Sequence, residues 1–372
     1  MANLTRDEFV ALVTSARSEE RGRVIAVPVS IRVLSDQLTP VLAYRRLVAP
    51  GARTAPSFLL ESVEGGERQG RYSILGSAPV MEAVAYGRRL TVIDRRAGAE
   101  RIEESEPENP LLSLRELTAP VRLVEPLRGP RPLLPACVLG GWFGYAGYDT
   151  VRYAEPSKLA TPPRDDRGLP DLHFGFYDGV TVFDHVDKVV YLVQLALVGE
   201  KDDAGKAWDR ARDALHERLA AIEKHSKPLP SGVFEREAAG AGVMKSNITR
   251  EEHAAMVAKA KEYIRAGDIF QVVIGQRFER ESAVDPFDVY RALRAVNPSP
   301  YMVYLQARGC ILVASSPEIL CRVARRATHD GGAGGAHDLV VTNRPLAGTR
   351  KRGATPEEDR ALEQELLAYA KE

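Results

Sequence analysis

The sequence predicts a mixed α/β protein of the α+β kind, in which an antiparallel sheet is combined with amphipathic helices. Three observations favour this class. Short runs of apolar and β-branched residues are separated by glycine, proline or charged turns. Two of these runs are joined by a tight polar turn, as in a hairpin. In several other segments, apolar residues recur every three or four positions, which is typical of a helix with one buried face.

The first half of the chain is expected to be rich in strands. A short helix at 6–17 opens it, because Phe9, Leu12 and Val13 share helical spacing. A long helix at 208–222 closes it, and a stretch of proline, serine and glycine at 225–232 follows as the best candidate for a linker. Between the two helices, strands are expected at 43–48, 57–60, 72–75 and 90–93, and a hairpin at 179–185 and 188–193.

The second half carries clearer helix boundaries. Thr249 and Glu252 form a capping box, and Gly267 ends the helix that they begin. Thr355 and Pro356 begin a last helix that reaches the end of the sequence without a stop signal, so we expect an N-terminal portion of a longer protein. Strands are expected at 269–274, 301–305, 311–313 and 339–342, the last two joined by a glycine-rich loop.

The composition restricts the function. The 51 Lys and Arg residues balance the 51 Asp and Glu residues, so the chain lacks the basic excess that nucleic acids and anionic membranes select. Three cysteines, Cys137, Cys310 and Cys321, form no CxxC pair, which indicates a reducing compartment. No apolar run reaches the roughly 20 residues of a membrane helix, and no signal peptide is visible. We therefore expect a cytoplasmic protein that binds neither nucleic acid nor membrane.

Generic catalytic motifs are missing: the sequence has no Walker loop, GxGxxG, GxSxG or HExxH. Four positions remain as candidates. Gln271 falls in an apolar strand, where it is either a buried structural amide or a site residue. Glu318 follows a strand through a Ser-Ser-Pro turn; buried there, its carboxyl would keep its proton as a general acid does, although a cap or an ion pair is the alternative. Gly348 and Thr349 fit an anion-binding turn or a plain one.

Taken in order, six segments of this chain resemble the large component of anthranilate synthase, in the family of chorismate-utilising enzymes. The resemblance extends from about Thr39 to Glu372. It implies two stacked, largely antiparallel sheets with surrounding helices and chorismate between them, a fold that this sequence leaves incomplete at its C-terminus. It also implies a tryptophan-site region at 20–180 and a truncated catalytic region at 240–372. The segments are 59–62, 70–73, 267–273, 297–302, 315–318 and 344–353.

The resemblance implies a function as well. The whole protein would be an Mg²⁺-dependent lyase that converts chorismate and ammonia to anthranilate and pyruvate, the first committed step of tryptophan biosynthesis. Ammonia would come from a glutamine amidotransferase partner, component II, in a heterotetramer, and tryptophan would inhibit by feedback. Glu318 matches the general acid, and Glu372 is an edge member of a metal-ligand set that lies mostly beyond the chain. Substrate contacts fall on Gln271, Gly348 and Thr349, and tryptophan contacts on Ser62, Pro300, Tyr301 and Met302.

Two positions separate this reading from related chemistries. Relatives that make aminodeoxychorismate carry lysine where this chain has Ala347, and relatives that make isochorismate or salicylate carry lysine where it has Gln271. Both residues therefore favour ammonia as the nucleophile. Aminodeoxychorismate synthase is the alternative within the enzymes. A truncated, non-catalytic remnant that binds tryptophan or a partner is the alternative outside them.

Overall fold

The computed structural model describes residues 2–49, 52, 54–64, 68–126, 134–159, 161–224, 244–327, 337–344 and 349–368. The chain divides into two compact units, Met1–Leu229 with Leu293–Glu372, and Pro230–Ala292. Helix α7 (Pro286–Val296) begins in the smaller unit and ends in the larger one. The region boundaries expected from the resemblance, 20–180 and 240–372, follow a different division and stay a prediction.

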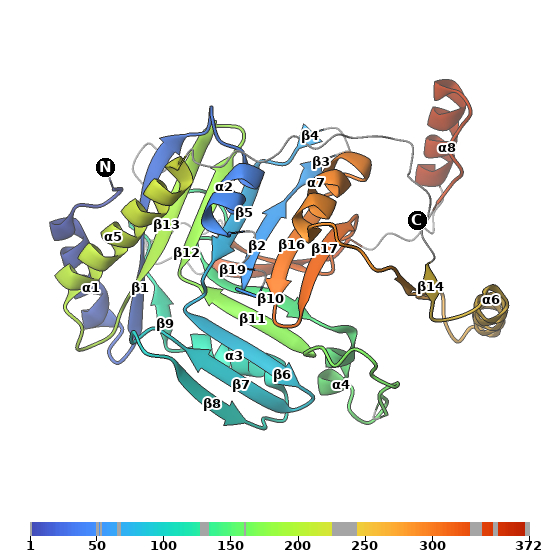
Figure 1. Ribbon diagram of the computed structural model, residues 1–372, viewed down its shortest axis with the longest axis horizontal. Helices are drawn as coiled ribbons and strands as arrows, with labels where there is room; N and C mark the ends of the chain where they lie inside the picture. The colour runs from blue at the N-terminus through green and yellow to red at the C-terminus, as the bar shows by residue number, and fades with distance from the viewer. Residues whose placement is uncertain are drawn as a thin grey trace. The chain divides into compact units, whose positions relative to one another are not determined.

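An eight-stranded sheet is the largest sheet of the larger unit (Figure 1). All neighbouring strands run antiparallel except the parallel pair β1 and β9. The expected strands at 57–60, 72–75 and 301–305 and the hairpin at 179–193 are confirmed within it. Its order is β17 (Cys310–Ser316), β16 (Tyr301–Ala307), β2 (Ser57–Glu61), β5 (Tyr72–Ser77), β12 (Gly179–Asp184), β13 (Val189–Val198), β1 (Val24–Leu34) and β9 (Val121–Leu123).

A five-stranded antiparallel sheet packs against the first. The two sheets meet where Phe58 of β2 stacks on Phe143, with ring centroids 4.0 Å apart, and Tyr177 adds an edge-on contact to Phe58 at 4.8 Å. The expectation of two stacked, largely antiparallel sheets is thereby confirmed. The order of the second sheet is β10 (Gly141–Ala146), β11 (Leu172–Tyr177), β6 (Met81–Tyr86), β7 (Arg89–Asp94) and β8 (Arg101–Ser105).

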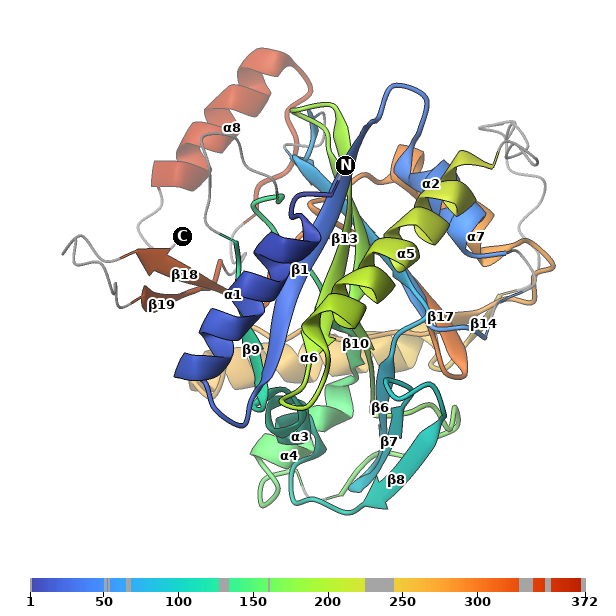
Figure 2. The same cartoon turned by 90° about the vertical axis from the view of Figure 1, so that its left-hand side faces the viewer.

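Three helices pack against the large sheet, as Figure 2 shows. They are α1 (Arg6–Glu19), α2 (Pro40–Leu47) and α5 (Ala204–Glu223). Phe9 and Val13 of α1 and Leu215 of α5 are buried, which is the apolar face that their spacing predicts. The second sheet is covered by Leu114 and Leu117 of α3 (Pro110–Thr118). Short helical turns form η1 (Tyr148–Thr150) and α4 (Val151–Ala154).

The strand expected at 43–48 is wrong, because α2 occupies these residues. Thr39 caps this helix: its hydroxyl accepts a hydrogen bond from the Leu42 N–H at 3.2 Å. Pro40 stands at the first turn, where it needs no N–H partner. The cap and the proline together outweigh the strand preference of the apolar residues that follow.

The pairing expected for 311–313 is also wrong. Strand β17 pairs with β16, while 339–342 belongs to β19 (His337–Thr342), which pairs with β18 (Arg322–Ala327). Because β18 contains three arginines, its sequence lacks the apolar pattern by which a strand is predicted. Helix α8 (Pro356–Ala368) begins as expected, with the Glu358 N–H donating to Thr355 Oγ1 at 3.2 Å. A further short pair joins β3 (Val63–Glu64) and β4 (Arg68–Gln69).

The smaller unit contains α6 (Arg250–Ala266) and a short pair of strands, β14 (Lys245–Ser246) and β15 (Phe278–Glu279). The capping box of Thr249 and Glu252 is confirmed. Gly267 ends α6 with a φ of 84°, a left-handed conformation that suits glycine. The predicted linker at 225–232 lies outside the described residues. Within the described ranges, no helix is long and apolar enough to cross a membrane.

The strand expected at 269–274 is wrong, and with it the burial of Gln271. The segment has no regular structure, Gln271 is exposed, and Phe270 keeps 91% of its surface exposed. A strand that is apolar on both faces forms only where neighbouring strands cover it, and no described strand pairs with residues 269–274. Instead, Ile269, Val272 and Ile274 line an apolar hollow of about 230 Å³ with Met256, Ala260 and Tyr263 of α6.

Candidate functional site

The residues expected to bind tryptophan lie at one end of two paired strands. Ser62 directly follows β2, and β16 begins at Tyr301. Met302 lies opposite Glu61 in the β2–β16 register. Segments far apart in the sequence, 61–62 and 300–302, therefore meet at the same end of the strands.

Glu61 gives this corner a buried charge. Its side chain is only 4% exposed and pairs with Arg294 near the end of α7, with Nε 2.7 Å from Oε2 and a second guanidinium nitrogen 3.0 Å from Oε1. Such a two-pronged contact fixes both the position and the orientation of the carboxylate. Glu61 falls within segment 59–62 of the resemblance, but nothing in the neighbouring sequence indicates a partner 233 positions away.

The turn at 297–300 is held by both neighbouring strands. Ser315 of β17 donates through Oγ to the Asn297 carbonyl at 2.6 Å, and Ser299 Oγ donates to the sulfur of Met302 at 3.6 Å. Met302 is buried, with 1% of its surface exposed, whereas Pro300 and Tyr301 are exposed. The turn thus presents two exposed residues above a fixed methionine.

Gly70 closes the corner from the other side. Its N–H donates to the Ser62 carbonyl at 2.6 Å. A Cβ at this position would lie 2.6 Å from Ser62 Cβ and 2.7 Å from its Oγ, so no larger residue fits without moving Ser62. Arg71 follows and pairs with Asp184 at 2.9 Å and with Asp187 at 3.1 Å.

His185 directly follows β12 and contacts the neighbouring strand β5. His185 and Ser73 of β5 share a hydrogen bond of 2.7 Å between Nε2 and Oγ. Burial, followed by the charges of Lys188 and Arg294, lowers the pKa of His185, although Asp184 acts in the opposite direction. The imidazole is therefore neutral near neutral pH and adds no charge to the corner.

Glu318 lies in the expected turn but not in the expected environment. The Glu318 N–H donates to Ser316 Oγ at 3.4 Å, just beyond the end of β17. Its side chain is exposed, so the burial that was to hold its proton is absent. The reason is topological: β17 is the edge strand of the sheet, and within the described ranges only β16 pairs with it.

The other expected site residues are not brought together in the described structure. Thr349 is exposed, and its carbonyl accepts a hydrogen bond of 3.1 Å from Arg350. Gly348 and Glu372 lie outside the described residues. Gln271 belongs to the smaller unit, whereas Glu318 and Thr349 belong to the larger one.

A metal site is not formed by the residues that the structure describes. They contain no group of three or more His, Cys, Asp or Glu side chains able to hold an ion. Two acidic side chains in the first turn of α8 instead accept hydrogen bonds from residues that precede the helix. Glu358 accepts from the Ala354 N–H at 2.8 Å, and Asp359 accepts from the Gly353 N–H at 2.8 Å and from Arg352.

Residues 61–372 match the sequence model of a family described as chorismate binding enzyme. The chain is 44% identical over 380 residues to anthranilate synthase alpha subunit 2, chloroplastic, of Arabidopsis thaliana, covering 100% of this chain and 57% of that protein. It is 39% identical over 354 residues to anthranilate synthase component 1 of Acetivibrio thermocellus, covering 93% of this chain and 64% of that protein.

A solved structure supports the fold. Anthranilate synthase component I from Streptococcus pneumoniae TIGR4 aligns with a TM-score of 0.56 and 27% sequence identity, covering 92% of this chain and 65% of that one. The chain spans little more than half the length of the plant relatives that it matches.

Proposed function

Because the chain belongs to the chorismate binding enzyme family, we propose that it is part of the large component of an anthranilate synthase. The proposed reaction converts chorismate and ammonia to anthranilate, pyruvate and water. Ammonia adds at C2 of the ring while the C4 hydroxyl leaves as water. Loss of the enolpyruvyl group as pyruvate, with a ring proton, then makes the ring aromatic. This makes the enzyme a lyase.

The observation that carries the proposal is the register of three neighbouring strands. Glu61 lies opposite Met302, and Met302 lies opposite Ser315. The end of β2, the turn before β16 and the turn after β17 therefore lie at the same end of these neighbouring strands. Three of the segments that resemble the family, 59–62, 297–302 and 315–318, meet there, although they are far apart in the sequence.

Glu318 is proposed as the general acid. Hydroxide is a poor leaving group, so its departure requires a proton from a placed carboxylic acid. Ser316 holds the backbone of Glu318 at the end of β17. The backbone at Gly348 and Thr349, and the amide of Gln271, are proposed to contact the carboxylates of chorismate.

Mg²⁺ belongs to the proposal only by resemblance. Bound to a substrate carboxylate, such an ion would neutralise its charge. The described residues do not form a site for it, since Glu358 and Asp359 are already engaged as caps and ion-pair partners. No step of the reaction is therefore assigned to the metal.

Tryptophan is proposed as an inhibitor at the corner of Ser62, Pro300, Tyr301 and Met302. The corner combines an ion pair, Glu61 with Arg294, a hydroxyl at Ser62 and an apolar turn. An amino acid that carries an ammonium, a carboxylate and an aromatic ring presents complementary groups. The proposed source of ammonia is a glutamine amidotransferase partner, component II, in a heterotetramer, in a cytoplasmic setting.

A product assay tests the proposal. The complete protein that contains this chain is incubated with chorismate, an ammonium salt and Mg²⁺, and anthranilate is followed by its fluorescence. We expect anthranilate to appear and Glu318→Gln to reduce its rate by about a hundredfold or more. Glu357→Gln, an exposed glutamate on α8, serves as the matched control and is expected to keep the wild-type rate. Chorismate that is recovered unchanged would contradict the proposal.

A further inference from the structure

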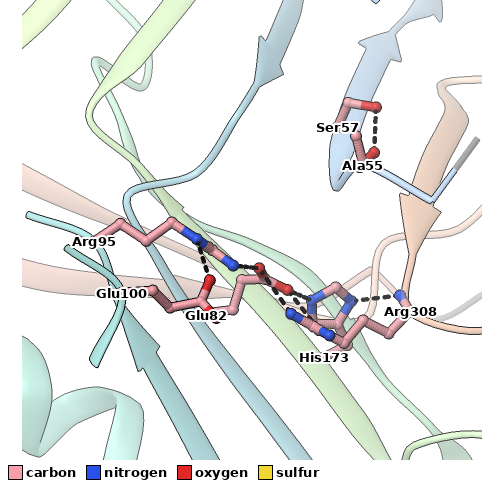
Figure 3. A network of polar contacts seen from close by, with 7 residues as sticks. All are labelled: Ala55, Ser57, Glu82, Arg95, Glu100, His173 and Arg308. Carbon is pink, nitrogen blue, oxygen red and sulfur yellow. Dashed lines mark hydrogen bonds and ion pairs between the residues drawn. The ribbon is translucent and has the colours of Figure 1, made fainter. Parts of the chain in front are cut away.

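A buried carboxylate lies on the central strand of the second sheet, outside the segments that the resemblance selects. Glu82 of β6 has a side chain that is 1% exposed, and three donors converge on it (Figure 3). His173 Nε2 lies 3.0 Å from Oε2, Arg308 Nε lies 2.9 Å from Oε2, and an Arg95 guanidinium nitrogen lies 2.8 Å from Oε1. A second nitrogen of Arg308 reaches Oε1 at 3.2 Å.

Arg308 is anchored twice by this network. Besides its guanidinium contacts, its backbone N–H donates to His173 Nδ1 at 3.1 Å. That nitrogen therefore accepts, and the ring proton is on Nε2, where it points to Glu82. Glu82 and His173 come from the paired strands β6 and β11 of the second sheet. Arg308 comes from neither: it is the first residue of the turn between β16 and β17.

The network thus fixes the tip of a hairpin that belongs to the other sheet. The β16–β17 register runs from Ala307 opposite Cys310 at the tip to Tyr301 opposite Ser316 at the open end. Strand β17 is an edge strand, so among the described strands only β16 holds it laterally. Its orientation depends on β16 and on what holds the tip.

The cost of this arrangement argues for a specific role. Burying a carboxylate with arginines adds little net stability, because the desolvation of the charges offsets much of their attraction. A two-pronged contact from arginine does, however, fix the orientation of the two groups as well as their distance. What the network delivers is therefore a defined position of the hairpin tip against the second sheet.

We propose that Arg308 is a positioning residue for the reaction, which through Glu82 and His173 fixes the β16–β17 hairpin and so places Glu318 beyond its open end. The inference rests on the proposed function, because Glu318 is its general acid. A change in the angle of a stiff hairpin is largest at the end opposite the anchor. A displacement of about 1 Å at a catalytic group lowers the rate by as much as about a hundredfold.

The chain offers a matched control for the test. Arg95 contacts the same carboxylate at 2.8 Å, but it lies between β7 and β8 of the second sheet and does not join that sheet to the hairpin. Arg308→Met and Arg95→Met each remove one guanidinium from Glu82. Only the first removes a side-chain contact between the hairpin and the second sheet, although the backbone bond from residue 308 to His173 is kept. A role in stability alone predicts similar effects of both changes on catalysis, whereas positioning predicts different ones.

The experiment measures kcat and KM for chorismate, per folded protein, in the complete enzyme. For Arg308→Met we expect kcat to fall by about tenfold or more, with KM changed by less than about threefold. For Arg95→Met we expect kcat within about twofold of wild type. Arg308→Lys keeps a positive charge but cannot make the two-pronged contact, so its kcat is expected between those of wild type and Arg308→Met.

Equal kcat values for the two methionine variants would overturn the inference. If Arg308→Met does not fold, the decision passes to Arg308→Lys: a kcat at the wild-type value overturns the inference, and a reduced kcat at unchanged KM supports it. Failure of the proposed function is distinguishable, because the wild-type enzyme itself would then release no anthranilate.

Discussion

Arg294 and Glu61 are 233 positions apart in the sequence, and their side chains form a two-pronged ion pair with a shortest contact of 2.7 Å. The pair joins the end of helix α7 to the end of β2, directly beside Ser62. Because the carboxylate is almost fully buried, its partner is needed both for stability and for the shape of the corner.

Removing the arginine should destabilise the protein. Arg294→Met leaves the buried Glu61 carboxylate without its counter-charge, and we expect unfolding in urea to become easier by about 3 kcal/mol. Arg291→Met is the control: it removes an arginine of the same helix whose partner at 2.9 Å, Asp288, is 51% exposed, and it should cost about 1 kcal/mol or less. Similar losses for both variants would contradict the role assigned to the buried pair.

Tryptophan binding should depend on Ser62 and Met302. Met302→Thr replaces a buried thioether by a shorter polar side chain, and Ser62→Ala removes a hydroxyl at the strand end. We expect isothermal titration to show tryptophan affinity reduced by about tenfold or more in either variant. Val303→Thr is the control, because adjacent residues of a strand point to opposite faces. Unchanged affinity in both test variants would show that tryptophan binds elsewhere, or does not bind.

The close approach of Gly70 to Ser62 predicts a sensitive position. Gly70→Ala places a methyl group 2.6 Å from Ser62 Cβ, so the strand end must move. We expect a loss of about 1–3 kcal/mol in unfolding free energy, together with loss of tryptophan binding. Gly275→Ala has no atom within 4 Å of the added methyl group and should be close to neutral in both measurements.

The Glu82 network predicts a pH dependence of stability. Burial by itself would raise the pKa of Glu82, but hydrogen bonds from His173, Arg308 and Arg95 and the charge of Arg308 lower it to about 2. A lowered carboxyl pKa stabilises the folded state above the unfolded value of about 4.5 and loses that effect as the pH falls toward about 2.

The stability difference between wild type and Glu82→Gln should follow that sign. We expect a difference of about 3 kcal/mol at neutral pH that shrinks as the pH falls from about 4.5 toward 3. Urea titrations across this range measure it. A difference that stays constant with pH would mean that the charge of Glu82 contributes nothing, and that only the shape of its side chain matters.

Much of the fold could be predicted where the signals are local. The capping box at Thr249, the left-handed Gly267 and the hairpin at 179–193 all rest on neighbouring residues, and all three are confirmed. The error at 43–48 is also local: the cap and proline at Thr39 and Pro40 indicate a helix, but the apolar residues after them received more weight.

The errors at the site have a different cause. The burial of Gln271 and Glu318 was inferred from apolar neighbours in the sequence, yet burial depends on strands that pair from elsewhere in the chain. The partners of Glu61 and Glu82, Arg294 and Arg308, are each more than two hundred positions away. The family resemblance could indicate that Ser62 and Met302 belong together, but it could not indicate which charged side chains lie beside them.

The fate of the nitrogen tests the central claim most directly. The complete protein, supplied with chorismate and isotope-labelled ammonium, should release labelled anthranilate and pyruvate in equal amounts, measured together by mass spectrometry. Labelled aminodeoxychorismate without pyruvate would assign the chain to a different reaction of the same family. Chorismate recovered without label, from protein shown to be folded, would contradict the account itself.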